Sequence, residues 1–147
     1  MKIINQTSAG GIVFKLVPSP QSLIPNRFWL ICQHSQHKGW VFPKGFVGDV
    51  NKNESNETAA LREVGEEGGI KAKIINNQPI KTQYSYTLEG NLIKKTVYYF
   101  LMEYVSGDPK DHDWEMADAK FVPEVEVKKT LTYPSDIEAF TKVLQGL

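Results

Sequence analysis

The strongest constraint on this 147-residue chain is one predicted helix that carries an acidic cluster. The helix extends from about Ser55 to Gly68, with Ser55 or Asn56 as the N-cap, and it ends where Gly69 can adopt a left-handed conformation without a Cβ clash. Three of its residues stand at i, i+3 and i+4: Glu63, Glu66 and Glu67. Helical periodicity places them on one face, within an arc of roughly 100°.

This acidic face favours a hard divalent cation. Like charges at these spacings destabilise a helix by roughly 0.2–0.5 kcal/mol per pair unless something neutralises them. Ligands that offer only oxygen favour Mg²⁺ or Mn²⁺. Arg62, four residues before Glu66, can brace the same face through a charge-assisted contact. Taken alone, the cluster is equally typical of a solvated acidic surface.

The rest of the chain predicts a sheet and a closing helix. β-Branched and aromatic runs indicate strands at 12–14, 28–32, 73–75, 83–88, 96–102 and 120–122, and Gly90-Asn91 is typical of a tight hairpin turn. A second helix is expected after Pro134, where Ser135 and Glu138 fit a capping box. We therefore expect an α/β fold, with a mixed sheet sandwiched between helices, in a single domain over residues 1–147.

Composition excludes several classes of protein. Lys+Arg and Asp+Glu balance at 17 each, which argues against a nucleic-acid partner on electrostatic grounds. No apolar run approaches the ~20 residues of a membrane span, so no membrane partner is expected. Cys32 is the only cysteine and lies within an apolar run, which predicts a core thiol and a cytoplasmic location. A zinc site at His34 and His37 is not expected, because no further ligand pair follows.

The segment around the acidic helix resembles a known motif. Glu54 is followed, after seven residues, by Arg62-Glu63-Val64-Gly65-Glu66-Glu67-Gly68-Gly69-Ile70. This resembles the Nudix box, Glu-x7-Arg-Glu-U-x-Glu-Glu-x-Gly-U with U aliphatic, and the resemblance extends from about Ser8 to Leu144. It implies the Nudix fold and Mg²⁺-dependent hydrolysis of a phosphoanhydride bond in a nucleoside diphosphate linked to another group.

The glycine that opens the box has two candidates. Gly48 satisfies the family's count of five residues before Glu54. The sequence from Trp40 to Gly45, however, is similar to the lead-in of the members that cleave dinucleoside polyphosphates. We prefer Gly45, with a three-residue insertion in the loop 47–53, and leave open which of the two carbonyls completes the metal site.

The resemblance also implies roles for individual residues. It assigns metal binding to Gly45, Glu63, Glu66 and Glu67, and structural support of the site to Glu54 and Arg62. Asp113-Trp114-Glu115 looks like the late family segment whose loop glutamate reaches the metals. The catalytic candidates that could take the proton of the attacking water are Glu63, Glu66 and Glu115.

Similar reasoning assigns the substrate contacts. Lys44 and Lys95 could neutralise phosphates as point charges. Tyrosines that match Tyr84, Tyr86 and Tyr133 hold phosphates and stack on a base in the family's diadenosine tetraphosphate hydrolases, although core packing is slightly favoured for Tyr86. The expected partner is therefore a small nucleotide substrate.

These contacts favour asymmetric cleavage of diadenosine polyphosphates to ATP and AMP. The alternatives are a house-cleaning hydrolase of (d)NTPs, a diphosphoinositol polyphosphate hydrolase and an RNA 5′-end pyrophosphohydrolase. A domain that senses a nucleotide without turnover is the non-enzyme alternative, but its usual mark is a lost box glutamate, and here every one is present.

Overall fold

The computed structural model describes residues 1–48 and 51–147. Within these ranges the strands are β1 (Ile3–Val17), β2 (Asn26–His34), β3 (Trp40–Val41), β4 (Lys44–Phe46), β5 (Ile70–Leu88), β6 (Asn91–Gly107) and β7 (Met116–Pro123). The helices are α1 (Asn56–Gly68), α2 (Glu124–Thr130) and α3 (Pro134–Gln145), with a short 3-10 helix, η1 (Pro109–Asp111), before β7. The insertion expected in the loop 47–53 includes Asp49 and Val50, which lie outside the described residues.

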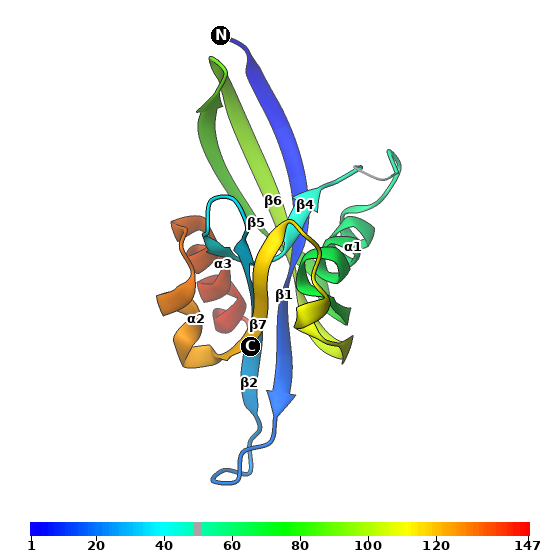
Figure 1. The fold of residues 1–147 in the computed structure, drawn as a ribbon, viewed down its shortest axis with the longest axis vertical. Helices are drawn as coiled ribbons and strands as arrows, with labels where there is room; N and C mark the ends of the chain where they lie inside the picture. The colour runs from blue at the N-terminus through cyan, green and yellow to red at the C-terminus, as the bar shows by residue number, and fades with distance from the viewer. Residues whose placement is uncertain (49–50) are drawn as a thin grey trace.

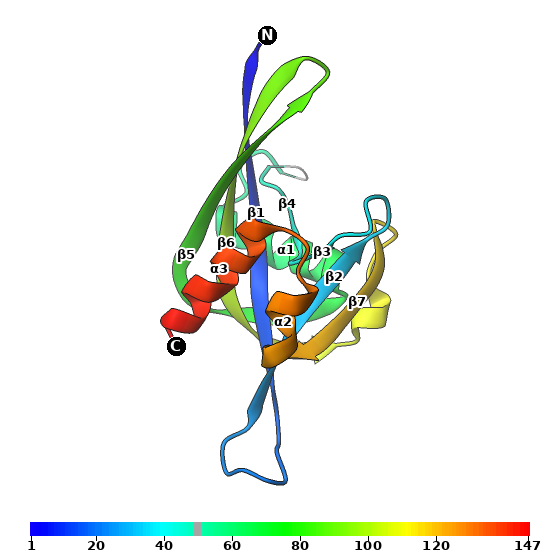
Figure 2. The same ribbon diagram turned by 90° about the vertical axis from the view of Figure 1, so that its left-hand side faces the viewer.

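The strands form one mixed sheet with the order β3-β2-β1-β6-β5, in which β4 also pairs with β1 and β7 with β2. β1 runs parallel to β6, and the other pairs are antiparallel. Figures 1 and 2 show α1 on one face of this sheet and α2 and α3 on the other. The expected mixed sheet between helices is therefore confirmed.

Strand alternation divides the core into two layers. Val13 pairs with Met102 and both pack on the α1 side, whereas Ile12 and Leu101, the preceding pair, pack on the α3 side. Gly11 lets α1 approach the sheet, because a β-carbon there would overlap Val64 and Met102. This close packing fixes the face of α1 that points away from the sheet.

The boundaries of α1 agree with the sequence prediction. The hydroxyl of Ser55 accepts a hydrogen bond from the backbone N–H of Thr58, at 3.1 Å, which satisfies one free donor of the first turn. At the other end Gly69 adopts φ 71°, and its N–H donates to the carbonyl of Gly65. The box glutamates are thus carried on a well-capped helix.

Several expectations about local structure were wrong. The runs at 73–75 and 83–88 belong to one strand, β5, which stays paired with β6 through three register shifts. The hairpin expected at 88–91 is confirmed, but its turn uses Glu89 and Gly90 at positive φ, and Asn91 already lies in β6. α3 begins without a side-chain cap, so the capping box expected at Ser135 does not form.

Helix α2 was not foreseen, because Val127 is its only buried residue and so no amphipathic stripe exists. The stripe predicted for α3 is present, since Phe140 and Val143 are buried and Ile137 packs beside them. No helix in the described ranges is both long and apolar enough to cross a membrane.

Cys32 is fully buried, and burial raises the pKa of its thiol well above the usual value, as expected for a core cysteine. The cytoplasmic location stays a prediction.

Candidate functional site

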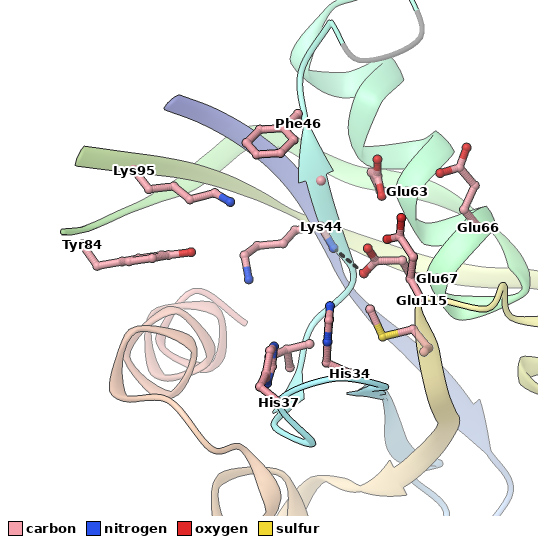
Figure 3. A pocket seen from close by; sticks show the side chains of 13 residues that line it. His34, His37, Lys44, Phe46, Glu63, Glu66, Glu67, Tyr84, Lys95 and Glu115 are labelled. Carbon is pink, nitrogen blue, oxygen red and sulfur yellow. Dashed lines mark hydrogen bonds between the residues drawn. The ribbon is translucent and has the colours of Figure 1, made fainter. Parts of the chain in front are cut away.

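Most of the predicted site residues line a cavity of about 320 Å³ beside β4 (Figure 3), whereas Tyr133, Glu54 and Arg62 do not. The cavity lies where β4 pairs with β1 and faces α1, so the strand separates an acidic wall from a basic one. The predicted residues that line it are Lys44, Gly45, Glu63, Glu66, Glu67, Tyr84, Lys95 and Glu115. We call it the glutamate cavity.

The acidic wall contains two buried carboxylates. Glu63 is 4% exposed and Glu67 is 5% exposed, so both have lost most of their hydration. Burial, and then the charge of Glu63, raise the pKa of Glu67 to about 9, although the backbone N–H of Lys44 donates to its Oε1 at 3.2 Å. Burial also raises the pKa of Glu63. Two desolvated carboxylates that repel each other are a site suited to a cation.

Arg62 holds the glutamates in place from the side. Its Nη1 donates to Glu63 at 2.7 Å and to Glu66 at 3.3 Å. Its Nε and Nη2 donate to Glu54 at 3.2 and 2.9 Å, and Nη2 also donates to the carbonyl of Phe46. The hydrogen bond from Arg62 lowers the pKa of Glu54. Arg62 thus joins Glu54 to two glutamates of the acidic wall, and the supporting role of this pair stays a prediction.

The two candidate glycines contact different partners. A β-carbon at Gly45 would overlap the carboxylate of Glu63, so this position needs glycine for a close approach. Gly48 has φ 84°, and its N–H donates to Glu54 at 2.9 Å. Gly45 thus lies against the acidic wall, and Gly48 orients the supporting carboxylate. The binding of a metal by the carbonyl of Gly45 or of Gly48 stays a prediction.

The donor set fits a hard divalent ion such as Mg²⁺. Glu63, Glu66, Glu67 and Glu115 all present carboxylates to the cavity, and oxygen is the ligand that Mg²⁺ prefers. Within residues 1–48 and 51–147, no group of three or more Asp, Glu, His or Cys side chains is arranged so that it could hold a metal ion by itself. Arg62 engages oxygens of Glu63 and Glu66 instead. A Mg²⁺ site that shares its ligands with waters and substrate phosphates requires no such closed cluster.

Glu115 reaches this wall from the loop between η1 and β7. Its charge contributes to the raised pKa values of both Glu63 and Glu67, which places its carboxylate close to them. The backbone holds this position, because the N–H of Asp113 donates to the carbonyl of Glu66 at 2.7 Å and the N–H of Ser35 donates to that of Glu115 at 2.9 Å. Glu115 therefore lies beside the box glutamates, and its part in metal binding or proton transfer stays a prediction.

Lys44 and Lys95 form the basic wall across from the glutamates (Figure 3). Burial, and then the charge of Lys44, lower the pKa of Lys95 to about 8. The ammonium of Lys95 also lies 4.6 Å from the centre of the Phe46 ring. The basic wall therefore presents two lysine ammonium groups to the cavity. That of Lys95 is poorly hydrated because it is buried, so it can bind an anion.

His34 and His37 form the floor of the cavity, a role that sequence reasoning did not assign. Their rings stack with centroids 4.1 Å apart and an interplanar angle of 9°. The backbone N–H of Gln36 donates to Nδ1 of His34, and that of Gly39 donates to Nδ1 of His37. Because Nδ1 accepts in both rings, each neutral imidazole carries its proton on Nε2. Their position at the end of an apolar strand was the only signal in the sequence.

A second, more apolar cavity of about 660 Å³ adjoins the first and shares His37, Val41, Lys44 and Tyr84 with it. Its other lining residues include Tyr86, Tyr133 and Asp136, so we call it the tyrosine cavity. Tyr133 donates its hydroxyl proton toward Nδ1 of His37, at 2.9 Å. Tyr86 is 39% exposed and lines this cavity, so the expectation of core packing for Tyr86 was wrong.

Asp136 is a further residue that the sequence did not reveal. It is 3% exposed, and its Oδ1 accepts a hydrogen bond from the hydroxyl of Tyr99 at 2.7 Å. Burial raises the pKa of Asp136. A buried aspartate at the start of α3 thus lies at the back of the tyrosine cavity.

Comparison with known proteins agrees with this geometry. The family model described as NUDIX domain matches residues 22–143. A Mycobacterium tuberculosis protein named MutT4 and described as a candidate mutator protein is 29% identical over 139 residues, which cover 92% of this chain and 53% of that protein. The chain therefore spans about half the length of this curated relative.

Solved structures share the fold. The Ap4A hydrolase of C. elegans superposes with a TM-score of 0.69 and 20% identity, covering 97% of this chain and 98% of that one. The NUDIX domain of Shewanella oneidensis NrtR, solved with ADP ribose, gives a TM-score of 0.68 and 17% identity over 97% and 88% of the two chains. Because the family model covers most of the sequence and the three helical glutamates of the box line one cavity, this chain belongs to the Nudix family.

Proposed function

We propose that this chain is a Mg²⁺-dependent hydrolase of phosphoanhydride bonds, with Mn²⁺ as a possible substitute, and that its substrate is a diadenosine polyphosphate cleaved asymmetrically to ATP and AMP. One observation carries the proposal: the glutamate cavity and the tyrosine cavity adjoin and share Lys44 and Tyr84. The first suits a polyphosphate with its metal, and the second suits an uncharged aromatic base.

The chemistry divides between the two walls of the glutamate cavity. Glu63, Glu66 and Glu67, with a glycine carbonyl beside them, would hold Mg²⁺, which when bound neutralises phosphate oxygens and activates water. Lys44 and Lys95 draw negative charge from the phosphate chain on the opposite side. A phosphoanhydride resists attack chiefly because its phosphates repel the nucleophile, so these charges lower the barrier.

A carboxylate must accept the proton of the attacking water. Glu63, Glu66 and Glu115 are the candidates for this role, and all three line the glutamate cavity. Glu63 is tied to Arg62 at 2.7 Å, and Glu66 to the same arginine at 3.3 Å. Glu115 has no side-chain hydrogen bond within the described ranges, so its carboxylate is the least committed of the three. We favour Glu115 for proton transfer on this ground.

The tyrosine cavity supports a nucleoside as part of the substrate. Tyr84 and Tyr86 have ring centroids 6.2 Å apart, and Tyr133 lines the same cavity. An aromatic surface of this kind contributes ~1–3 kcal/mol per stacked base. The similar C. elegans structure is titled an Ap4A hydrolase, in keeping with this substrate.

The alternative substrates would require cavities lined by other side chains. A diphosphoinositol phosphate would require many basic groups, whereas the described lining of the two cavities contains Lys44 and Lys95 and no arginine. RNA 5′ ends would favour a basic surface, and the net charge of the chain is zero. A house-cleaning role on (d)NTPs is the second candidate, because the relative MutT4 is described as a candidate mutator protein.

The test is product analysis by chromatography after incubation with diadenosine tetraphosphate and Mg²⁺. We expect ATP and AMP in equal amounts, no product from Glu67→Gln, and unchanged activity in Glu57→Gln, whose side chain lies in the first turn of α1 outside the cavity. Two ADP molecules would exclude asymmetric cleavage. Turnover of (d)NTPs alone would favour the house-cleaning role, and tight binding without any turnover would favour a sensor.

A further inference from the structure

Trp114 is exposed in a way that packing does not explain. Its side chain is 81% exposed, whereas Trp29 is fully buried. Exposure of so large an apolar surface to water is unfavourable by roughly 25 cal/mol per Å². A single exposed apolar side chain is common on protein surfaces, so the case for a function of Trp114 rests on its position beside the site.

The loop around Trp114 is nevertheless held firmly in place. On one side, the N–H of Asp113 donates to the carbonyl of Glu66 in α1, at 2.7 Å. On the other side, the carbonyl of Glu115 accepts the N–H of Ser35, at 2.9 Å, and the N–H of Glu115 donates to the side chain of Asp113 at 3.1 Å. The backbone therefore positions Trp114 by contacts with the helix that carries the box glutamates.

Trp114 lines a third cavity next to the glutamate cavity. This cavity, of about 220 Å³, is lined by His34, Ser35, Gln36, Trp114 and Glu115. It shares His34 and Glu115 with the glutamate cavity and no residue with the tyrosine cavity. We call it the tryptophan cavity.

The three cavities lie in sequence along the site. Figure 3 shows Tyr84 and Glu115 on opposite sides of Lys44, so the tyrosine and tryptophan cavities adjoin the glutamate cavity at separate places. An aromatic surface thus stands at each end of a site built for phosphates. A mononucleotide has only one base and would leave one of these surfaces empty.

We propose that Trp114 is the stacking platform for the second nucleobase of a dinucleoside polyphosphate whose first base occupies the tyrosine cavity. This inference rests on the proposed function and extends it, because it explains how the site would distinguish a substrate with a base at both ends. Ser35 and Gln36 supply polar groups around the platform, and the indole face supplies the stacking surface.

The experiment compares two substrates that differ only in the second nucleoside. Steady-state kinetics with Mg²⁺ are measured for diadenosine tetraphosphate and for adenosine 5′-tetraphosphate. In Trp114→Ala we expect KM for the dinucleotide to rise about 10-fold with kcat nearly unchanged, and KM for the mononucleotide to stay the same. Trp114→Phe keeps an aromatic face and should restore most of the affinity.

The control is Val125→Ala, which truncates another exposed apolar side chain on α2, away from all three cavities. A rise in KM of equal size for both substrates, or no rise for either, would overturn the role of Trp114 and leave the proposed function standing. Failure of the native protein to cleave either substrate would overturn the proposed function, and this inference with it.

Discussion

Gly45 and Glu63 are in contact so close that no side chain fits at position 45, because a β-carbon there would overlap the carboxylate of Glu63. The contact joins β4 to α1, and the carboxylate is also fixed from the other side by Arg62 at 2.7 Å. The acidic wall therefore depends on a strand residue that carries no charge. Gly45 therefore has a steric role, in addition to the metal binding proposed for its carbonyl.

Gly45→Ala tests this steric role. The new methyl group must push Glu63 away, and a misplacement of about 1 Å at a catalytic group costs on the order of 10²-fold in rate. We expect kcat to fall by about that factor while the melting temperature changes little. Gly146→Ala is the control, since Gly146 has φ −88° at the end of α3 and an added β-carbon there would make only ordinary contacts. Equal activity of Gly45→Ala and the native protein would exclude the steric role.

Glu67→Gln separates metal binding from folding. Glu67 is buried beside Glu63, and its pKa of about 9 keeps its carboxyl protonated at neutral pH when no metal is bound, so the neutral amide of glutamine should leave the metal-free protein about as stable as the native one. Mg²⁺ should raise the melting temperature of the native protein and have a much smaller effect on the variant. Thermal unfolding with and without Mg²⁺, beside Glu57→Gln, measures the difference. A Mg²⁺-induced shift of native size in Glu67→Gln would exclude Glu67 as a ligand.

The sequence predicts those parts of the fold that local chemistry determines. The α1 helix has an N-cap, a left-handed C-cap at Gly69 and a periodic acidic face, and each signal is confined to neighbouring residues. α3 was recognised from its apolar stripe. The capping box at Ser135 failed because Pro134, as the first helical residue, moves the helix start back to Tyr133.

Other features depend on contacts that no local pattern contains. The exposure of Tyr86 follows from the projection of the β5–β6 hairpin beyond the helices, which Figures 1 and 2 show clearly. The stacked pair of His34 and His37 requires a turn whose backbone N–H groups bind both rings. The bond between Tyr99 and Asp136 joins residues 37 positions apart, on a strand and a helix. The chemistry of each residue alone could not predict which residues would contact one another.

Lys95 should make the reaction sensitive to pH. Its pKa is lowered to about 8 by burial and by Lys44, so it is charged at neutral pH and loses its proton as the pH rises through about 8. Loss of the charge removes a phosphate contact, so kcat/KM, which reports the free enzyme, should fall above this pH. In Lys95→Arg the guanidinium stays charged, and the fall should move to higher pH.

Lys94→Gln is the matched control for this pH profile. Lys94 is exposed and, by strand alternation, lies on the opposite face of β6 from Lys95. We expect its kcat/KM profile, measured at constant ionic strength, to match that of the native protein. If Lys95→Arg kept the native profile, another group would have to cause the fall.

Arg62→Lys tests whether the arginine is needed for its geometry or only for its charge. Arg62 donates to three glutamates and to the carbonyl of Phe46, and a lysine ammonium cannot reproduce that planar set. Glu63 would be left buried with a poor partner, so we expect a loss of roughly 2–3 kcal/mol, below the ~3–5 typical of a broken buried pair because the charge is kept. Activity should fall as well, since Glu63 loses its lateral support.

Arg27→Lys is the control, because it makes the same change at the more exposed pair with Glu124. There we expect a loss of stability of less than about 1 kcal/mol and native activity. Urea unfolding of both variants gives the comparison, and equal losses would mean that Arg62 contributes charge alone.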